Sequence, residues 1–556
     1  MNLAELLAAS ARRLPKHPAV TFAGQTASYA TFLDRVLRLG HALRSKPFSL
    51  SPGDRVLLCM ENSGAFLEAL FACWAAGLCA VPTNAKLHPK EIAYIARDAR
   101  TRLTMTTKGL QDALAPVLDG AGPLISANDD VWLRMLLTDP LRALHPSAPE
   151  DEAWVFYTSG TTGRPKGAIL SHRNLLFMAH CYYADMDHLD ENDTKLHAAP
   201  LSHASGLYGL PHLFRGSHQV ILKGFDPQEI LDHIGHYPNV ALFGAPTMVT
   251  RLVNAHGVES VNTRNLRTLY YGGGPMYVAD LQRALAIFGP KLIQIFGQGE
   301  SPMTITALSK SHHAETEHPR YHERLASCGV ARTGVAFRVV DDNDQELPFG
   351  EIGEVITRSD CVMKGYLGNP EATAKTLRSG WLHTGDVGSV DSEGFLTLRD
   401  RSKDMIISGG SNIYPREIEE VLLRDPAVLE CSVVGRPHPD WGEEAVAFVV
   451  SASGDSLDIG SLEQLCLDNM ARFKRPKAWR VVEALPHGGP DGPGVTNQMH
   501  DALYGEWYLS QLERVTGVIT EAMTTSHPAF PDVVFPAEAH HSVPDEDGVH
   551  TMLSCG

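Results

Sequence analysis

The chain has 556 residues, of which 44% are hydrophobic and 20% charged, and its formal net charge is −17 at pH 7. This length predicts a globular protein of at least two domains, because a single hydrophobic core rarely extends beyond about 250–300 residues. The negative charge argues against nucleic acid or an anionic membrane as the main partner. We find no run of eighteen apolar residues, so no membrane span is expected.

The N-terminus and the cysteines favour a cytoplasmic protein. Glu5, Arg12 and Arg13 interrupt the first residues before any apolar run is long enough for an export signal. The nine cysteines are scattered without Cys-x-x-Cys pairs, which argues against a zinc site and against a disulfide framework. Reduced thiols in the cytoplasm are the simplest interpretation.

The first part of the chain alternates apolar runs typical of strands with patterns typical of helices. This alternation predicts an α/β fold of layered subdomains with largely parallel sheets. The predicted strands cover residues 55–59, 220–222, 240–243, 266–270 and 292–296, and the predicted helices cover residues 63–76 and 279–288.

Short strands separated by Gly and Asp turns follow, which indicates a β-rich subdomain at the end of a large domain. They cover residues 336–340, 354–357 and 395–398. The polar run 399–404 then marks a domain boundary, and a small α/β unit is predicted beyond it, with a helix at 415–423 and strands at 428–434 and 445–450. The predicted domains are therefore 1–400, 401–490 and a divergent acidic tail at 491–556.

Residues 157–168, with the sequence Tyr-Thr-Ser-Gly-Thr-Thr-Gly-Arg-Pro-Lys-Gly-Ala, are typical of a phosphate-binding loop. Glycines let successive N–H groups converge on an anion, hydroxyls add donors, and a lysine supplies a mobile charge. The spacing does not fit a Walker loop, and an ordinary surface turn is the alternative. The candidate ligands are Thr158, Ser159, Gly160, Thr161, Thr162, Gly163 and Lys166.

This loop resembles the phosphate-binding signature of the adenylate-forming superfamily, which includes acyl- and aryl-CoA ligases, adenylation domains of peptide synthetases and luciferases. The resemblance extends from about Leu3 to about Leu485, with the motifs in the family's order. It implies a large N-terminal domain and a small, mobile C-terminal α/β domain. It also implies activation of a carboxylic acid with ATP and Mg²⁺, followed by transfer to coenzyme A.

The resemblance assigns roles around the triphosphate. Lys166 and the loop hydroxyls would hold the β- and γ-phosphates. Glu300 would bind Mg²⁺ together with Thr161, since this hard cation prefers oxygen ligands. Glu300 belongs to the motif 295–301, which also contributes Phe296, Gly297 and Gln298 to the nucleotide site. Gly299 stands where the family often has a threonine near the α-phosphate.

Two further motifs resemble parts of the nucleoside site. The turn 271–275 resembles the adenine-binding turn, where Gly273, Gly274 and Pro275 would lie against the base. Asp386 matches the carboxylate that accepts hydrogen bonds from the ribose hydroxyls, and Arg401 matches its basic partner. The alternative for the turn 271–275 is an ordinary strand-to-helix turn, and the alternative for Asp386 and Arg401 is a purely structural salt bridge.

The segment 200–207 looks like the family segment that lines the acid pocket. His203 would orient or gate the carboxylate, with an ordinary core or surface histidine as the alternative. Gly206, Gly209 and Gly272 are expected to leave room for a ring or an acyl chain.

The segment 405–415 resembles the loop that admits the thiol arm of coenzyme A after rotation of the small domain. Gly409 and Gly410 would form a narrow slot for pantetheine, and Lys403 stands at the hinge position that absorbs the rotation. Ser411 replaces a glutamate common in this branch. An apolar strand ending in a glycine turn is the alternative.

The resemblance breaks down after residue 486. Relatives carry a Gly-Lys loop there, whose lysine bridges the carboxylate and the α-phosphate during adenylation, whereas this chain has no lysine after Lys477. We therefore expect an impaired adenylation half-reaction. The tail 491–556 allows three interpretations: a regulatory segment, a substitution that changed the chemistry, or a scrambled terminus.

The leading hypothesis is an AMP-forming acid:CoA ligase that acts on an aryl or medium-chain acid through an acyl-adenylate. One alternative keeps ATP activation but uses an amine as acceptor or a small inorganic acid such as nitrite as substrate. Another is an ATP-binding protein that has lost adenylation. The predicted partners are a small-molecule acid, ATP, and coenzyme A or another acceptor, and nucleic acid is not expected. The sequence leaves open whether the chain forms a homodimer.

Overall fold

The computed structural model describes residues 1–118, 122–158, 165–274, 276, 278–401, 406–413, 415–422, 424–453, 457–483 and 485. The chain divides into two compact units, Met1–Asp501 and Ala502–Gly556. All described residues belong to the first unit. The predicted tail, the hinge residue Lys403 and residues 159–164 of the predicted phosphate loop lie outside them.

The larger sheet of the described chain, here called sheet A, has nine strands in the order β15-β14-β13-β12-β11-β9-β10-β1-β2. Neighbouring strands from β1 to β13 along this order pair in parallel, whereas β2, β14 and β15 pair antiparallel with their neighbours. The largely parallel arrangement confirms the predicted fold class. The strands are β1 (Pro18–Phe22), β2 (Gln25–Ser28), β9 (Thr194–His197), β10 (His218–Ile221), β11 (Val240–Gly244), β12 (Leu266–Gly272), β13 (Leu292–Gln298), β14 (Ser301–Leu308) and β15 (Val330–Ala331).

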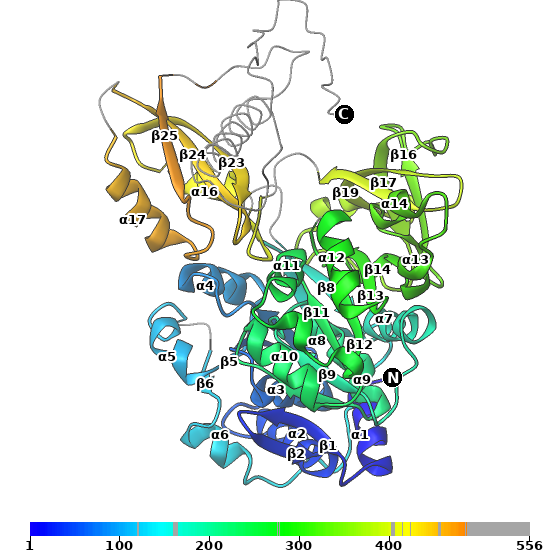
Figure 1. Cartoon of the computed structure of the whole chain (residues 1–556). Helices are drawn as coiled ribbons and strands as arrows, with labels where there is room; N and C mark the ends of the chain where they lie inside the picture. The colour runs from blue at the N-terminus through cyan, green and yellow to red at the C-terminus, as the bar shows by residue number, and fades with distance from the viewer. Residues whose placement is uncertain are drawn as a thin grey trace, which may run out of the picture. The chain divides into compact units, whose positions relative to one another are not determined.

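The two faces of sheet A differ, because successive side chains of a strand point to opposite sides. Leu196, Leu242 and Leu269 belong to a core that includes residues of α10 (Pro227–His236), α11 (Pro246–Val253) and α12 (Val278–Phe288). These helices cover one face of the sheet (Figure 1). The opposite face carries Lys195 and Tyr270, and the Tyr270 ring lies 6.2 Å from that of Tyr182 on α7 (His172–Asp185).

The second large sheet of the described chain, sheet B, has the order β6-β5-β3-β4-β7-β8. Its last two strands form an antiparallel pair in which Thr158 lies opposite Lys166. The predicted phosphate loop therefore connects the two strands of a hairpin. The strands are β3 (Arg55–Cys59), β4 (Cys79–Thr83), β5 (Leu103–Thr106), β6 (Leu124–Ser126), β7 (Glu152–Thr158) and β8 (Lys166–Ser171).

Helix α3 (Gly64–Ala75) illustrates why the apolar patterns fold as they do. Its residues from Ala65 to Ala75 are all buried, as expected for a helix that is hydrophobic on every side. Helix α7 begins where Ser171 caps it, since the Ser171 hydroxyl accepts a hydrogen bond from the Asn174 amide at 3.2 Å. The other α-helices of the first domain are α1 (Ala4–Arg13), α2 (Tyr29–Arg44), α4 (Pro89–Asp98), α5 (Lys108–Leu114), α6 (Asp130–Met135), α8 (Ala204–Leu207), α9 (Gly209–Arg215), α13 (Lys310–Ala314), α14 (Tyr321–Leu325) and α15 (Pro370–Thr376).

The predicted β-rich subdomain is an antiparallel sheet that contains β16 (Ala336–Val340), β17 (Gly353–Arg358), β18 (Leu377–Arg378), β19 (Trp381–Val390) and β20 (Leu396–Arg401). Strand β20 continues into the polar run that we expected to interrupt the structure. Pairing with β19 supplies backbone hydrogen bonds to these polar residues, so Arg401 still lies opposite Asp386.

The residues beyond form a separate sheet with its own core, which includes Ile406, Ile418 and Val433. Its elements are β21 (Ile406–Ser408), β22 (Ser411–Ile413), α16 (Pro415–Leu422), β23 (Val428–His438), β24 (Gly442–Ser451), α17 (Ile459–Asn469) and β25 (Ala478–Val482). The expected helix and strands are thus present, although both strands are longer than predicted.

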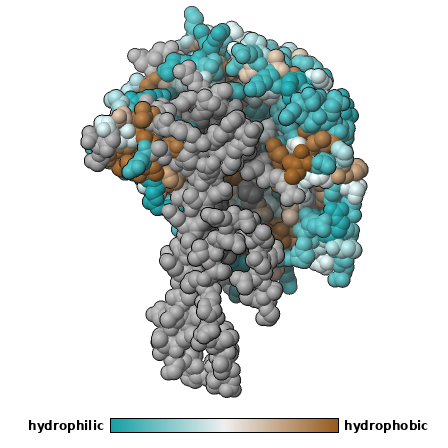
Figure 2. All heavy atoms as spheres, turned by 90° about the horizontal axis from the view of Figure 1, so that it is seen from above, coloured by the Kyte–Doolittle hydropathy of each residue, from teal (hydrophilic) through white to brown (hydrophobic). Residues whose placement is uncertain are grey.

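Among the described residues, no helix is both long and apolar enough to cross a membrane. Figure 2 shows a largely hydrophilic surface with separate hydrophobic areas. The exposed large apolar side chains include Leu137, Phe349 and Leu429, which come from distant parts of the sequence.

Candidate active site

Glu300 lies between β13 and β14 and is 7% exposed. Its Oε1 accepts a hydrogen bond from the Thr158 hydroxyl at 2.9 Å and another from the Tyr366 hydroxyl at 2.8 Å. The fold thus brings the end of β7 to the predicted Mg²⁺ ligand. Two hydroxyl donors hold the carboxylate in one orientation.

Lys166 lies at the start of β8, and its Nζ is 5.2 Å from the centre of the Tyr366 ring. Tyr366 therefore contacts both the predicted phosphate-binding lysine and the predicted metal ligand. Tyr366 is absent from the residues that the sequence motifs predicted. The available signal was an aromatic residue directly after Gly365 in the run Lys-Gly-Tyr-Leu-Gly-Asn, where a glycine turn places a ring beside β8.

The residues around Glu300 fit Mg²⁺ in the donor atoms they offer. This cation takes oxygen ligands and is commonly bound by one or two carboxylates together with substrate phosphates. Glu300 supplies a carboxylate beside the strand ends that flank the predicted phosphate loop. Thr161, the other predicted metal ligand, lies outside the described residues.

The predicted ribose ligand Asp386 is held by Gln298, which belongs to the same motif, residues 295–301, as Glu300. Gln298 Nε2 donates to Asp386 Oδ2 at 2.7 Å and to the Thr384 carbonyl oxygen at 2.6 Å. Asp386 is 1% exposed. The structure thereby joins two motifs that are 88 positions apart in the sequence.

The predicted adenine turn follows β12. Gly273 has a φ of +81°, a backbone conformation that glycine adopts without strain. Pro275 lies outside the described residues. The turn therefore has the geometry expected of a glycine-rich connection, and its contact with adenine stays a prediction.

His203 packs edge to face against Phe156, with the ring centres 5.3 Å apart. Its Nδ1 is 2.8 Å from the Ser202 hydroxyl. Burial lowers the pKa of His203 to about 4, so the imidazole is neutral near pH 7. Phe156, on β7 two residues before Thr158, is likewise absent from the predicted site residues.

Gly206, Gly209 and Gly272 do not leave the room that we expected for a ring or an acyl chain. A Cβ atom at Gly206 would lie 1.8 Å from the Leu201 carbonyl oxygen, and one at Gly272 would lie 2.2 Å from the Ile295 carbonyl oxygen. At Gly209 the nearest atom is His197 Cε1 at 3.0 Å. That expectation was wrong, because these glycines permit close packing of the chain against itself.

Gly299 has a similar role. A Cβ atom there would lie 2.4 Å from Thr158 Cγ2 and 2.6 Å from Phe156 Cδ1. The Phe156 ring thus lies beside the site where a larger residue at position 299 would begin. This contact supplies a physical reason for glycine in place of the family's threonine.

Replacing Gly299 with threonine is expected to lower stability by about 1–3 kcal/mol, the usual range for overpacking. Chemical denaturation would measure the change. The second substitution Phe156→Val should recover part of the loss, because it removes the ring that the new side chain meets. Additive effects of Gly299→Thr and Phe156→Val would contradict the proposed contact.

Gly409 and Gly410 connect β21 and β22, with φ values of +55° and +75°. Positive φ at both central residues is typical of a tight type I′ hairpin turn, which favours glycine. An apolar strand that ends in a glycine turn, without any role in binding, therefore accounts for both glycines. A role in admitting the thiol arm of coenzyme A stays a prediction.

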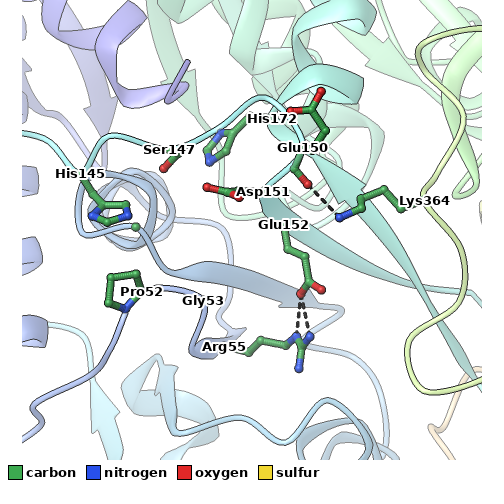
Figure 3. A pocket seen from close by; sticks show the side chains of 11 residues that line it. Pro52, Gly53, Arg55, His145, Ser147, Glu150, Asp151, Glu152, His172 and Lys364 are labelled. Atoms are coloured by element: carbon green, nitrogen blue, oxygen red, sulfur yellow. Dashed lines mark hydrogen bonds and ion pairs between the residues drawn. The ribbon is translucent and has the colours of Figure 1, made fainter.

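A surface pocket of about 380 Å³ lies elsewhere in the first domain (Figure 3). Its charged groups are already partnered: Arg55 Nη2 is 2.7 Å from Glu152 Oε2, and Lys364 Nζ donates to the Glu150 carbonyl oxygen at 2.9 Å. None of the predicted site residues lines it. We therefore place the candidate active site around Glu300.

Two family models match the chain. Residues 7–367 match the AMP-binding enzyme family, and residues 417–489 match the AMP-binding enzyme C-terminal domain. The chain therefore belongs to the AMP-binding enzyme family, a part of the adenylate-forming superfamily.

Similar proteins include several ligases. A feruloyl-CoA synthase of an Amycolatopsis species is 36% identical over 490 residues, which cover 86% of this chain and 94% of the relative. A fatty acid–[acyl-carrier-protein] ligase of Streptomyces coeruleorubidus is 33% identical over 508 residues, covering 89% and 95%. The structure of an amide bond synthetase from Marinactinospora thermotolerans aligns with a TM-score of 0.81 and 28% identity, covering 91% of this chain and all of that one.

Proposed function

We propose that this protein activates an aryl or medium-chain carboxylic acid with ATP and Mg²⁺, and then transfers the acyl group to coenzyme A. The contact of Glu300 with Thr158 and Tyr366 carries the proposal, because it places a buried carboxylate at the strand ends that flank the phosphate loop. The similarity to a feruloyl-CoA synthase supports an acid substrate and coenzyme A as acceptor.

Each residue then has a defined task. Lys166 supplies positive charge to the triphosphate, while Gln298 keeps Asp386 oriented toward the ribose hydroxyls. The neutral imidazole of His203 orients the acid without adding a charge beside the reacting carboxylate. Bound Mg²⁺ would neutralise phosphate charge, which otherwise repels the carboxylate.

Pyrophosphate release over a panel of aryl and alkyl acids tests the function. We expect release to require an acid, and an acyl-CoA product to form when coenzyme A is added. Glu371 on α15 is exposed, so Glu371→Gln serves as a control that should leave both measurements unchanged. ATP binding without pyrophosphate release from any acid would instead favour a protein that has lost adenylation.

An amine acceptor is the second candidate, since the amide bond synthetase aligns over 91% of this chain. Amide formation without a requirement for coenzyme A would favour it. The same assay, supplied with amines, distinguishes the two acceptors.

A slow first half-reaction would agree with the missing lysine, whose expected position lies outside the described residues. The cytoplasmic location and a homodimer also stay predictions.

A further inference from the structure

Asp386, the predicted ribose ligand, lies in an irregular part of strand β19. The register of β19 against β17 shifts there, so that the single residue Val355 of β17 faces residues 384–386 of β19. Such an insertion is a β-bulge, which leaves backbone groups outside the regular pairing and redirects side chains. We call residues 384–386 the Asp386 bulge. Contacts other than the regular ladder must fix its position.

Strand β17 holds the backbone of the Asp386 bulge at two points. The Gly385 amide donates to Glu354 Oε1 at 3.0 Å, and the Thr384 hydroxyl donates to the Val355 carbonyl oxygen at 2.6 Å. The Thr384 hydroxyl also accepts from the Asp386 amide at 3.0 Å. Hydrogen bonds on both preceding residues therefore connect β17 to Asp386.

The Glu354 contact fixes the position of the bulge, and burial does not require it. Gly385 is exposed, so water could pair with its amide in place of Glu354. Gly385 also has a φ of +70° and no side chain, and glycine has access to several other backbone conformations. A hydrogen bond from the neighbouring strand selects one of them. Gln298 orients the Asp386 carboxylate from the other side, whereas Glu354 acts on the backbone.

The second oxygen of Glu354 has different partners. Glu354 Oε2 lies 2.8 Å from His383 Nδ1 and 3.8 Å from Arg378 Nη2. The Arg378 side chain is 43% exposed and that of Glu354 29%, and ion pairs at such positions contribute little to stability. An ion pair between β17 and β18, without any effect on Asp386, is the structural alternative for Glu354.

We propose that Glu354 is a positioning residue for ribose binding. Its Oε1 holds the Gly385 amide, and this contact places Asp386 where its carboxylate accepts hydrogen bonds from the ribose hydroxyls. The inference rests on the proposed function, which supplies ATP and the role of Asp386. It assigns part of the selection for ribonucleotides to a residue that acts through the backbone of the bulge.

Calorimetric titration of the full chain with ATP and with 2′,3′-dideoxy-ATP, which lacks both ribose hydroxyls, tests the proposal. The native chain should bind ATP at least about tenfold more tightly, because a charged acceptor loses its partners in the analogue. Glu354→Ala should reduce this preference several-fold. Glu354→Gln keeps an oxygen that can accept from the Gly385 amide, so it should retain most of the preference.

Arg378→Gln is the matched control. It removes the charged partner on the Oε2 side of Glu354 and keeps the Oε1 contact, so the preference for ATP should be unchanged. Glu354→Met keeps the length of the side chain without an acceptor oxygen, and it replaces Glu354→Ala in the comparison if the alanine variant does not fold. An unchanged preference in the folded variant of Glu354, or an equal loss in Arg378→Gln, would overturn the proposal.

Pyrophosphate release separates this proposal from the proposed function. If Glu354→Ala loses the preference for ATP but no acid releases pyrophosphate from the native chain, the positioning role stands and the activity is wrong. If acids release pyrophosphate but the native chain binds both nucleotides equally, the activity stands and the positioning role is overturned. A native chain that binds neither nucleotide overturns both.

Discussion

Replacing Glu300 with glutamine is expected to lower acid-dependent pyrophosphate release by at least about 10²–10³-fold, the range seen when one preorganised group that stabilises developing charge is lost. Glutamine keeps the size of the side chain and can still accept from Thr158 and Tyr366. It removes the negative charge that Mg²⁺ requires. Single-turnover rates with saturating ATP would measure the effect.

The control for this experiment is Tyr366→Phe, which keeps the Glu300 carboxylate and removes one of its donors. We expect a smaller loss than for Glu300→Gln, together with a higher Mg²⁺ requirement, because the carboxylate is less firmly oriented. Wild-type rates in Glu300→Gln at limiting Mg²⁺ would show that another residue holds the metal.

The second large effect is a loss of stability in mild acid. Burial lowers the pKa of His172 to about 4, of His197 to about 3 and of His313 to about 4. An unfolded chain binds protons at these histidines below about pH 6.5. The free energy of unfolding should therefore fall by about 1.4 kcal/mol per pH unit and per histidine between pH 6.5 and the folded pKa, and be insensitive to these groups above pH 7.

Thermal unfolding between pH 8 and pH 5 measures this dependence. His313→Gln removes one titrating group, since His313 is 2% exposed and contacts the Tyr271 hydroxyl and the Ser309 carbonyl oxygen. The slope below pH 6.5 should become shallower in this variant. His256 is exposed, and His256→Gln should leave the slope unchanged. A Tm that stays constant from pH 7 to pH 5 would rule out the neutral buried histidines.

The motifs assigned to the nucleotide could be located in the sequence because each is compact and local, and their contacts with a nucleotide stay a prediction. The structure brings Thr158 and Glu300 together, as the motifs implied. Tyr366 and Phe156 were missed, since their contacts join segments far apart in the sequence. The expectation that Gly206 and Gly272 leave room for a substrate was wrong for the same reason. A glycine in the sequence shows only that no side chain is present, whereas the neighbouring segments, which the sequence pattern does not identify, fill the space beside it.

The sequence by itself determined the alternation of strands and helices, the order of the motifs and the family, because these follow from local composition and spacing. The tertiary structure decided which polar residues are buried. In Thr194-Lys195-Leu196-His197, the residues Lys195 and His197 lie on the same face of β9, and their polar side chains favour a face in contact with water. Both faces are covered instead, by α10–α12 on one side and by residues of α7–α9 on the other. Coverage by distant segments, which no local pattern encodes, leaves Lys195 and its neighbours inside the protein.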